Sequence, residues 1–166
     1  MVDAGWRIRP ATPGDVPGVL PMVRRICAQH EAWDPERYAM LPDVVERYAR
    51  WLPIRAANPR SVFLVAERED APPLVVGFLV ATVEGSIPIY RLKEYGFIHD
   101  LWVEADYRNE GLARQLVMLA VERFGDIGVQ QVRLDTAGPN DVARKLFERC
   151  GFRVSVVEML REKDPK

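Results

Sequence analysis

The sequence lacks the features that mark secreted, membrane-spanning and nucleic-acid-binding proteins. Lysine and arginine total 23 residues and aspartate and glutamate 24, so the net charge is −1, and no long basic run is present. This balance argues against nucleic acid as the main partner, although a local basic patch stays open. No apolar run has membrane length, and residues 1–10 hold two arginines and an aspartate where a signal peptide has its apolar core. We therefore expect no membrane anchor and no secretory leader.

Cysteine is scarce as well. The only two, Cys27 and Cys150, each lie within an apolar helical pattern. Buried free thiols in a reducing compartment explain this placement better than a disulfide between them, which stays open as the alternative. We therefore expect a cytoplasmic protein.

The apolar patterns predict one α/β domain (α+β in some schemes) over residues 1–166, a chain long enough for a full hydrophobic core. Alternating or continuous apolar runs predict strands over 6–9, 61–67, 74–84, 97–103, 130–136 and 152–160. Helical spacing predicts helices from Thr12, over 42–52 with Pro53 as its end, over 112–124, and from Asn140 to Gly151. The resulting order, βααβββαβαβ, predicts a mixed central sheet of about six to seven strands.

The most informative stretch is a strand that runs through a turn into an amphipathic helix. The strand covers 97–103, the turn is Arg108-Asn109-Glu110-Gly111-Leu112-Ala113, and Leu112, Leu116, Ala120 and Phe124 then recur on one helical face. A helix that starts on small residues presents unpaired N–H groups and the positive end of its dipole to an anion. Because Gly111 and Ala113 let ligand oxygens approach the backbone, this turn predicts a phosphate or pyrophosphate site.

Three blocks of sequence carry a family resemblance. They are Ile8-Arg9-Pro10-Ala11-Thr12 with Asp15, then residues 100–103 with the Arg-x-x-Gly-x-Ala turn, and finally residues 140–152, which read Asn-x-x-Ala-x-x-Leu-Phe-Glu-x-x-Gly-Phe. One short pattern recurs by chance, whereas three in the right order, each on the expected element, do not. In these blocks the chain closely resembles the GNAT superfamily of acetyl-CoA-dependent N-acetyltransferases, and the resemblance covers nearly the whole sequence.

The resemblance implies where acetyl-CoA binds. The strand at 97–103 is expected to splay from the one at 130–136, and the pantetheine arm to take main-chain hydrogen bonds from Leu101, Trp102 and Val103. One backbone N–H there would polarise the thioester carbonyl. The pyrophosphate is expected on the N–H groups of Asn109, Glu110, Gly111, Leu112, Ala113 and Arg114. Arg108 and Arg114 would add positive charge, and Asn140 would reach the pantetheine amides.

Several of these residues also have a purely structural interpretation. Gly111 can serve only to start the helix, Asn140 only to cap one, and Arg114 only to be solvated. Glu110 departs from the basic or small residue common in the family, and we expect its carboxylate to point away from the phosphates. No metal is expected.

Acetylation of a primary amine by direct attack in a ternary complex requires a neutral amine. An alkyl amine with a pKa of about 10.4 is only about one part in 2,500 neutral at pH 7, a handicap of roughly 4.6 kcal/mol. His99, one of two histidines, is the first candidate for the base, because arylalkylamine acetyltransferases of this family have a catalytic histidine at the matching position. Asp135 is the second, by resemblance to ribosomal-protein N-terminal acetyltransferases. Each has a structural alternative, sheet packing for His99 and turn ordering for Asp135, and Asp100 or Glu104 acting through water is a weaker option.

Phe147 departs from the family pattern. Many members have a tyrosine there whose hydroxyl protonates the departing CoA thiolate, and phenylalanine has no such proton. A thiol with a pKa near 8.5 can leave as the thiolate, so activity need not be lost. We expect Phe147 to pack against the pantetheine arm or the core, and Tyr90 or Tyr95 are open as substitute donors.

The acceptor is not identified by the sequence. In this family the first two helices and the loop before the cofactor strand wall its pocket, and these segments contain His30, Trp33, Asp34, Tyr38, Trp51, Tyr90 and Tyr95. Aromatic walls with a few acids suit a cationic amine. A small amine, an amino acid and a peptide or protein N-terminus all stay open, as does a homodimer. Two other functions also remain: a CoA-binding regulatory module without catalysis, and a sibling acyltransferase that uses another acyl-CoA or a hydroxyl acceptor.

Overall fold

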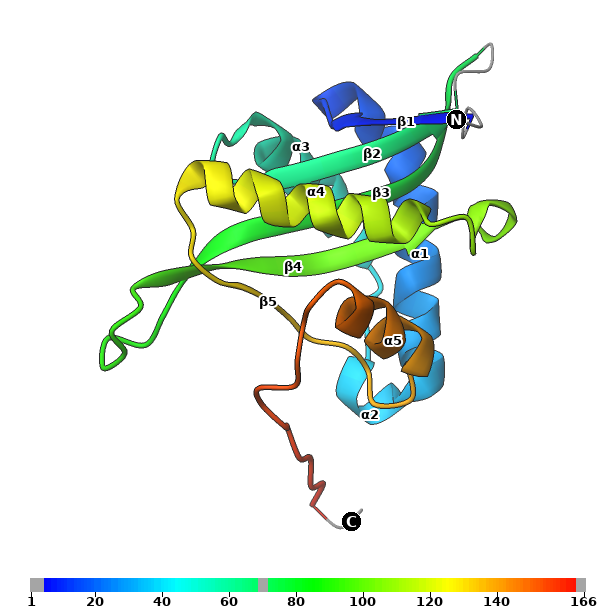
Figure 1. Cartoon of the computed structure of the whole chain (residues 1–166). Helices are drawn as coiled ribbons and strands as arrows, with labels where there is room; N and C mark the ends of the chain where they lie inside the picture. Colours follow the sequence, from blue (N-terminus) through cyan, green and yellow to red (C-terminus); the bar gives the residue numbers. More distant parts are fainter. Residues whose placement is uncertain (1–4, 69–71, 164–166) are drawn as a thin grey trace.

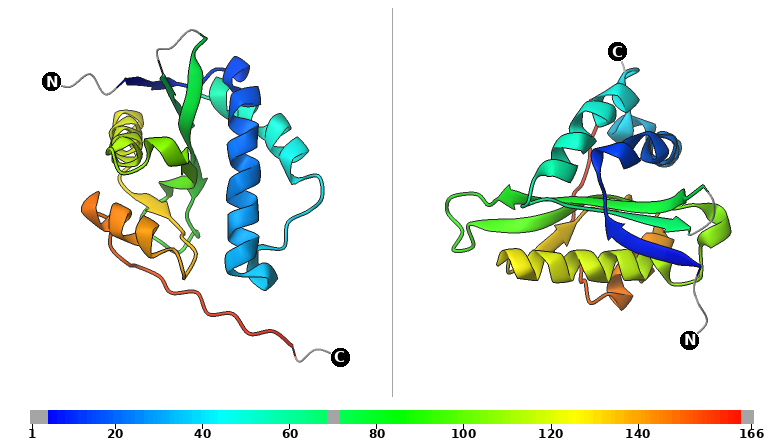
Figure 2. Two further views of the ribbon diagram at one scale, coloured as in Figure 1. Left: turned by 90° about the vertical axis from the view of Figure 1, so that its right-hand side faces the viewer. Right: turned by 90° about the horizontal axis from the view of Figure 1, so that it is seen from above.

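The computed structural model describes residues 5–68 and 72–163, which form one sheet with helices on both faces (Figure 1). The strands are β1 (Trp6–Pro10), β2 (Val62–Arg68), β3 (Leu74–Gly85), β4 (Glu94–Val103) and β5 (Val132–Leu134). The helices are α1 (Val16–Trp33), α2 (Pro35–Tyr38), α3 (Val44–Ala57), α4 (Leu112–Ile127) and α5 (Asp141–Arg149), with short 3₁₀ turns at Pro13–Asp15 and Ala105–Tyr107. Seen along the sheet, α1 and α3 cover one face and α4 and α5 the other (Figure 2).

The strand order β1-β2-β3-β4-β5 gives the mixed α/β sheet that the sequence predicts. The first four strands are antiparallel neighbours, and β5 runs parallel to β4. The β4–β5 pairing covers only Gly96↔Val132, Phe97↔Arg133 and Ile98↔Leu134. Beyond Ile98 the two strands part, so the expected splay is present, and β5 is shorter than the predicted 130–136.

The predicted last strand, 152–160, is wrong, and the described residues form five strands instead of about six to seven. The segment has the alternating apolar side chains of a strand, but Val154, Val156 and Met159 are 68%, 81% and 91% exposed. An extended segment becomes a strand only where a neighbouring backbone pairs with it, and none does so among the described residues. Arg37 of α2 holds the segment through a 2.8 Å ion pair with Glu158.

The second predicted helix was wrong in its boundary. Pro53 does not end α3, which continues to Ala57. Proline removes one backbone hydrogen bond from a helix interior, and this loss is tolerated where packing holds both sides. Here Leu52 is completely buried and Ala56 packs against the same apolar cluster. In the described ranges, no helix has the length and apolar character needed to cross a bilayer.

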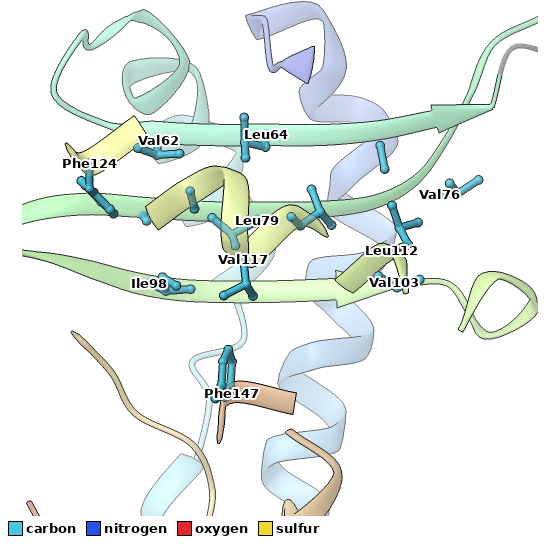
Figure 3. Close-up of a cluster of buried hydrophobic side chains, with 14 of the residues drawn as sticks. Val62, Leu64, Val76, Leu79, Ile98, Val103, Leu112, Val117, Phe124 and Phe147 are labelled. Carbon is cyan, nitrogen blue, oxygen red and sulfur yellow. The ribbon is translucent and has the colours of Figure 1, made fainter. Parts of the chain in front are cut away.

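The sheet separates two hydrophobic cores. On one side α4 presents the predicted face, with Leu112, Leu116, Ala120 and Phe124 no more than 1% exposed (Figure 3). On the other side α1 and α3 pack on the opposite face of the sheet. Cys27 belongs to this second core and Cys150 packs against the first. Both cysteines are free thiols, as expected, although Cys150 is only partly buried.

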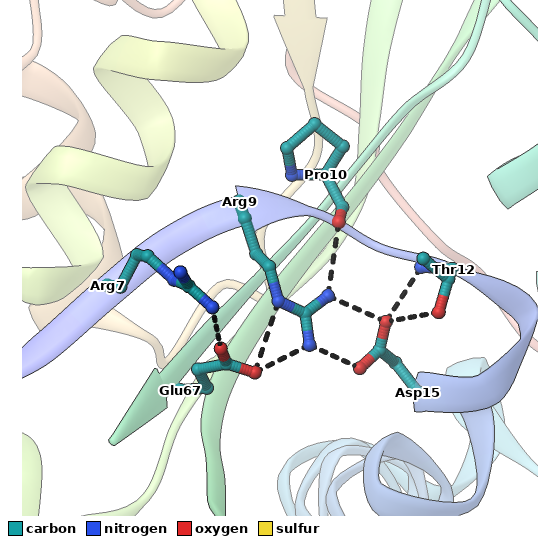
Figure 4. Close-up of polar contacts among 6 residues, drawn as sticks. All are labelled: Arg7, Arg9, Pro10, Thr12, Asp15 and Glu67. Atoms are coloured by element: carbon teal, nitrogen blue, oxygen red, sulfur yellow. Dashed lines mark hydrogen bonds and ion pairs between the residues drawn. The ribbon is translucent and has the colours of Figure 1, made fainter. Parts of the chain in front are cut away.

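A polar network joins the first sequence block to the sheet (Figure 4). The Arg9 guanidinium donates to Asp15 at 2.7 and 2.8 Å and to Glu67 at 2.5 Å, and Arg7 donates to the other oxygen of Glu67. Asp15 also accepts from the backbone N–H and hydroxyl of Thr12. These donors, Arg9 first, lower the pKa of Asp15 to about 2. The network fixes the start of α1 against β1 and β2.

Candidate active site

The splay leaves one edge of β4 without a strand partner. On its other side β4 pairs with β3 through Leu101↔Leu79, Trp102↔Phe78 and Val103↔Gly77. On the β5 side the described pairing stops at Ile98, before Leu101. An extended ligand with amide groups can therefore bind this edge as an added strand would.

The start of α4 offers a set of free backbone donors. Asn109 and Gly111 have positive φ angles of 65° and 87°, and they turn the chain sharply into the helix. The first amide that finds a helical acceptor is Gln115 N–H, which donates to Gly111 at 3.0 Å. Within the described residues, the N–H groups of Leu112, Ala113 and Arg114 have no acceptor. They and the helix dipole form a site for an anion.

Of the charged residues around the start of α4, one folds back onto β4 and two extend into solvent. Arg108 turns back, with its Nε donating to the Val103 carbonyl at 2.8 Å and its guanidinium 4.7 Å from the centre of the Trp102 ring. Arg114 and Glu110 are exposed. The Leu112 side chain is buried in the core, so that this residue can contribute only its backbone to a ligand.

Three other residues singled out from the sequence lie apart from this loop. Asn140 caps α5, and its side chain accepts from Ala143 N–H at 3.1 Å. Phe147 is 8% exposed and packs in the α4-side core, with its ring 5.7 Å from that of Phe152. Asp135 is exposed and follows directly after β5, beside the splay.

A β-bulge brings His99 and Asp100 to the same face of the sheet. Val80 is opposite Asp100 and Ala81 is opposite Ile98, so that β4 has one extra residue at His99. Regular alternation would send His99 and Asp100 to opposite faces. Instead both side chains reach α3. The centre of the His99 ring is 5.4 Å from that of the Trp51 ring, and Asp100 accepts a 2.9 Å hydrogen bond from the Tyr48 hydroxyl.

The hydrogen bonds of His99 determine which ring nitrogen is free. Thr82 donates its hydroxyl proton to Glu84 at 2.5 Å, and the same hydroxyl oxygen lies 2.6 Å from His99 Nε2. Because Thr82 has one proton and a carboxylate only accepts, His99 Nε2–H must donate to Thr82. The neutral ring then has its lone pair on Nδ1. Burial lowers the pKa of His99, although nearby Glu84 acts in the opposite direction. The lowered pKa favours the neutral ring at pH 7.

Asp100 is more deeply buried than His99. Burial raises its pKa to about 6, although the Tyr48 hydroxyl opposes that shift. Burial beside this carboxylate also raises the pKa of Tyr48 far above its ordinary value. Glu104, the other acid near the strand, is occupied: it pairs with Arg25 of α1 and accepts from Trp102 Nε1 at 3.3 Å.

A cavity of about 520 Å³ opens between α3 and β4. It is lined by Arg47, Tyr48, Arg50, Trp51, Ile54 and His99. A smaller, polar hollow of about 360 Å³ lies beyond the Thr82–Glu84 pair and includes Arg55 and Arg60. His99 thus lies in the wall of a cavity large enough for a small ligand. Asp135 does not line it.

Most of the residues expected to wall the acceptor pocket lie away from this cavity. Of the aromatic and acidic residues predicted from the sequence, only Trp51 lines the cavity. His30, Trp33 and Tyr38 form an aromatic cluster of their own at the end of α1, and Tyr95 packs under Arg133. The sequence did not single out Arg47 and Arg50; their spacing of three residues on one predicted helix was the available signal.

In the described part of the chain, no group of three His, Cys, Asp or Glu side chains is arranged to hold a metal ion.

Comparison with known proteins gives a family for residues 26–152, which match the Acetyltransferase (GNAT) family. Among curated proteins, N-alpha-acetyltransferase 30 of Saccharomyces cerevisiae is 28% identical over 95 residues, which cover 57% of this chain and 52% of the yeast protein. Human N-acetyltransferase 8 is 33% identical over 93 residues, 56% of this chain and 39% of the human protein. The chain thus spans about half or less of these relatives.

Solved structures share the whole fold. A predicted acetyltransferase from Clostridium acetobutylicum, solved with acetyl-CoA, has a TM-score of 0.72 and 19% identity, covering 95% of this chain and 96% of its own. A mutant protein from Bacillus halodurans has a TM-score of 0.80 and 19% identity, covering 95% and 99%. At these identities the likeness establishes the architecture.

Proposed function

Since the chain belongs to the Acetyltransferase (GNAT) family, we propose that it transfers the acetyl group of acetyl-CoA to a primary amine by direct attack in a ternary complex. The observation that carries this proposal is the junction of the unpaired β4 edge with the free N–H groups of Leu112, Ala113 and Arg114. Both curated relatives described above are named as N-acetyltransferases, and the yeast protein is named as an N-alpha-acetyltransferase.

The two parts of this junction suit the two parts of the donor. The N–H groups at the start of α4 fit a pyrophosphate, and Arg114 lies exposed in the first turn to add charge. The open edge at Leu101–Val103 fits the amide groups of a pantetheine arm. Acetyl-CoA supplies an activated thioester, and a backbone N–H of this edge would stabilise the negative charge on its carbonyl oxygen. Asn140 is engaged as a helix cap, which leaves its N–H₂ group for a further contact.

His99 is our candidate for the base that neutralises the acceptor amine. Thr82 holds its Nε2, so Nδ1 is the atom that would accept the proton in the α3-side cavity. A ring that is neutral at pH 7 can take up a proton at once, which a protonated ring cannot. Asp135 remains the second candidate, on the other side of the splay.

The departing thiolate has no donor at Phe147, whose ring is buried in the core. With a pKa near 8.5 the thiolate is a good leaving group without one, and water at the open edge can protonate it later.

Thiol release from acetyl-CoA, measured over a panel of amines and short peptides, tests this function. We expect turnover with at least one amine, and about a hundredfold loss of kcat in His99→Ala, within the usual range for a general base. Asp135→Ala alone and with His99→Ala separates the two candidates. If neither variant, nor the pair, changed turnover, the choice of base would be wrong.

The second candidate function is a CoA-binding module without catalysis. Its only support is Phe147, which lacks the hydroxyl proton of the tyrosine that many family members have at this position. It predicts that CoA raises the thermal stability of the protein while no acceptor releases thiol. If CoA had no effect on thermal stability, acetyl-CoA dependence itself would be refuted.

A further inference from the structure

The cavity beside His99 has a positive lining. Arg47 and Arg50 of α3 lie at its edge, and its other lining residues are Tyr48, Trp51, Ile54 and His99. No carboxylate is among its lining residues in the part of the chain that the structure describes, although the whole chain carries a slight negative charge. The cationic edge is therefore a local property of α3, which has three arginines and one glutamate.

These cations have capacity for a ligand. Within the described residues Arg50 makes no hydrogen bond or ion pair and its side chain is exposed, although Asp43 lies near enough to interact with it electrostatically. Arg47 donates to Asp43 through Nε alone, at 2.9 Å, so its terminal N–H groups have no partner among the described residues. Arg55, one turn after Trp51, does not line this cavity; its guanidinium lies 5.5 Å from the centre of the Trp51 ring and has no carboxylate partner in the described part of the chain.

Trp51 lines the same cavity as the arginines and His99. The centre of its ring is 5.4 Å from that of His99, and Arg47, four residues earlier on α3, lies on the same face of the helix. A ligand whose amine is next to His99 would therefore lie along Trp51 and extend toward Arg47 and Arg50. At about 520 Å³ this cavity, which is open to solvent, is in the usual range for a small molecule.

From this arrangement we propose that the acceptor carries an anionic group, a carboxylate or a phosphate, beside its reactive amine, and that Arg50 and Arg47 bind it. Arginine is suited to both groups because its N–H fork matches two anionic oxygens at once. The same charges repel polyamines, so the acceptor class differs from the cationic amine that the aromatic residues of the sequence suggest. The inference rests on the proposed function and names the substrate class of that site.

Matched acceptor pairs test this. They are alanine with alaninamide, phosphoethanolamine with ethanolamine, and two short peptides that differ only in glutamate or lysine at the second position. We expect kcat/KM to favour the anionic member of at least one pair by about tenfold, the value of one charge-assisted hydrogen bond. Which pair shows the preference tells whether the anion belongs to an amino acid, a phosphorylated amine or a peptide.

The variants Arg50→Gln and Arg47→Gln should each reduce that ratio severalfold. Arg123→Gln is the matched control, because Arg123 is an exposed arginine of α4 on the opposite face of the sheet, and its ratio should match that of the unaltered protein. Calorimetric binding of N-acetylalanine against N-acetylalaninamide, with CoA present, gives a second readout that does not depend on turnover.

A preference for the neutral or cationic members, or a ratio that Arg50→Gln and Arg47→Gln leave unchanged, would overturn this inference alone, since acetyl transfer would still be observed. No turnover of any acceptor by a protein that binds CoA would overturn both the inference and the proposed function.

Discussion

Gly96 of β4 lies against the ring of Phe124 on α4, with no room between them for a methyl group. A Cβ at position 96 would be 2.7 Å from two carbons of that ring. Phe124 is completely buried and cannot move aside without disturbing the core. This contact lets α4, whose first turn is the candidate anion site, pack closely on β4, the strand with the unpaired edge.

We therefore predict that Gly96→Ala destabilises the protein by about 1–3 kcal/mol, the usual cost of overpacking a core. Gly85→Ala is the matched control, because Gly85 ends β3 and a Cβ there meets nothing within 4 Å. Urea unfolding measures both. Equal midpoints for the two variants would show that the core accommodates the methyl group.

Gly111→Ala should weaken CoA binding about tenfold or more. Gly111 has a φ of 87°, which alanine adopts at a cost of roughly 1–2 kcal/mol, so the loop will relax and move its free N–H groups. Gly128→Ala is the control: Gly128 ends the same helix with a φ of 88° and equally open space around its Cβ. The two variants should lose similar stability, but only Gly111→Ala should lose affinity by calorimetry. Equal affinities would place the pyrophosphate elsewhere.

The pH dependence of acetyl transfer should identify His99 as the base. Its pKa is lowered by burial, so the ring stays neutral, and active, to a pH below the ordinary histidine value of 6.5. As pH falls further the ring gains a proton and kcat/KM should decline. That acid limb should be absent from the residual activity of His99→Gln. A limb that persists in this variant would assign it to another group.

Thr82→Val should reduce kcat about tenfold while the KM for acetyl-CoA changes little. Valine has the shape of threonine without the hydroxyl, so His99 would lose the acceptor that keeps its proton on Nε2. Thr82→Ser keeps the hydroxyl and should retain most of the activity. Comparable rates in the two variants would mean that the tautomer of His99 does not depend on Thr82.

Asp100→Asn should stabilise the protein at neutral pH and not at pH 4. Burial raises the pKa of Asp100 from 3.8 to about 6, so the fold favours the protonated carboxyl. That contribution is complete below the unfolded pKa and is lost as pH rises to about 6, whereas asparagine stays neutral throughout. The difference in unfolding free energy should grow between pH 4 and 6 to on the order of 2 kcal/mol. Parallel stability curves would contradict the raised pKa.

The sequence predicts features that depend on neighbours along the chain. The apolar face from Leu112 to Phe124 and the Asn140 cap follow from helical spacing and local hydrogen bonding, and the structure has both. Residues 152–160 show the limit of this reasoning, because a correct alternating pattern forms no strand where no backbone pairs with it.

The face of the sheet that carries the candidate base was less predictable for the same reason. Alternation along β4 places His99 and Asp100 on opposite faces, and only the register with β3 reveals the bulge that joins them. Likewise, Arg47 and Arg50 are ordinary solvated arginines until α3 is packed beside His99.

The Arg108 side chain fixes the spacing between the two places where the donor is proposed to bind. Because its Nε holds the Val103 carbonyl, the loop that would bind the phosphates is fastened to the strand end that would bind the arm. The distance between the start of α4 and the open edge of β4 is therefore fixed. If both places bind the donor as we propose, a thioester carried on an arm of another length would fill one place but not both, and the protein would select its donor by length as well as by charge.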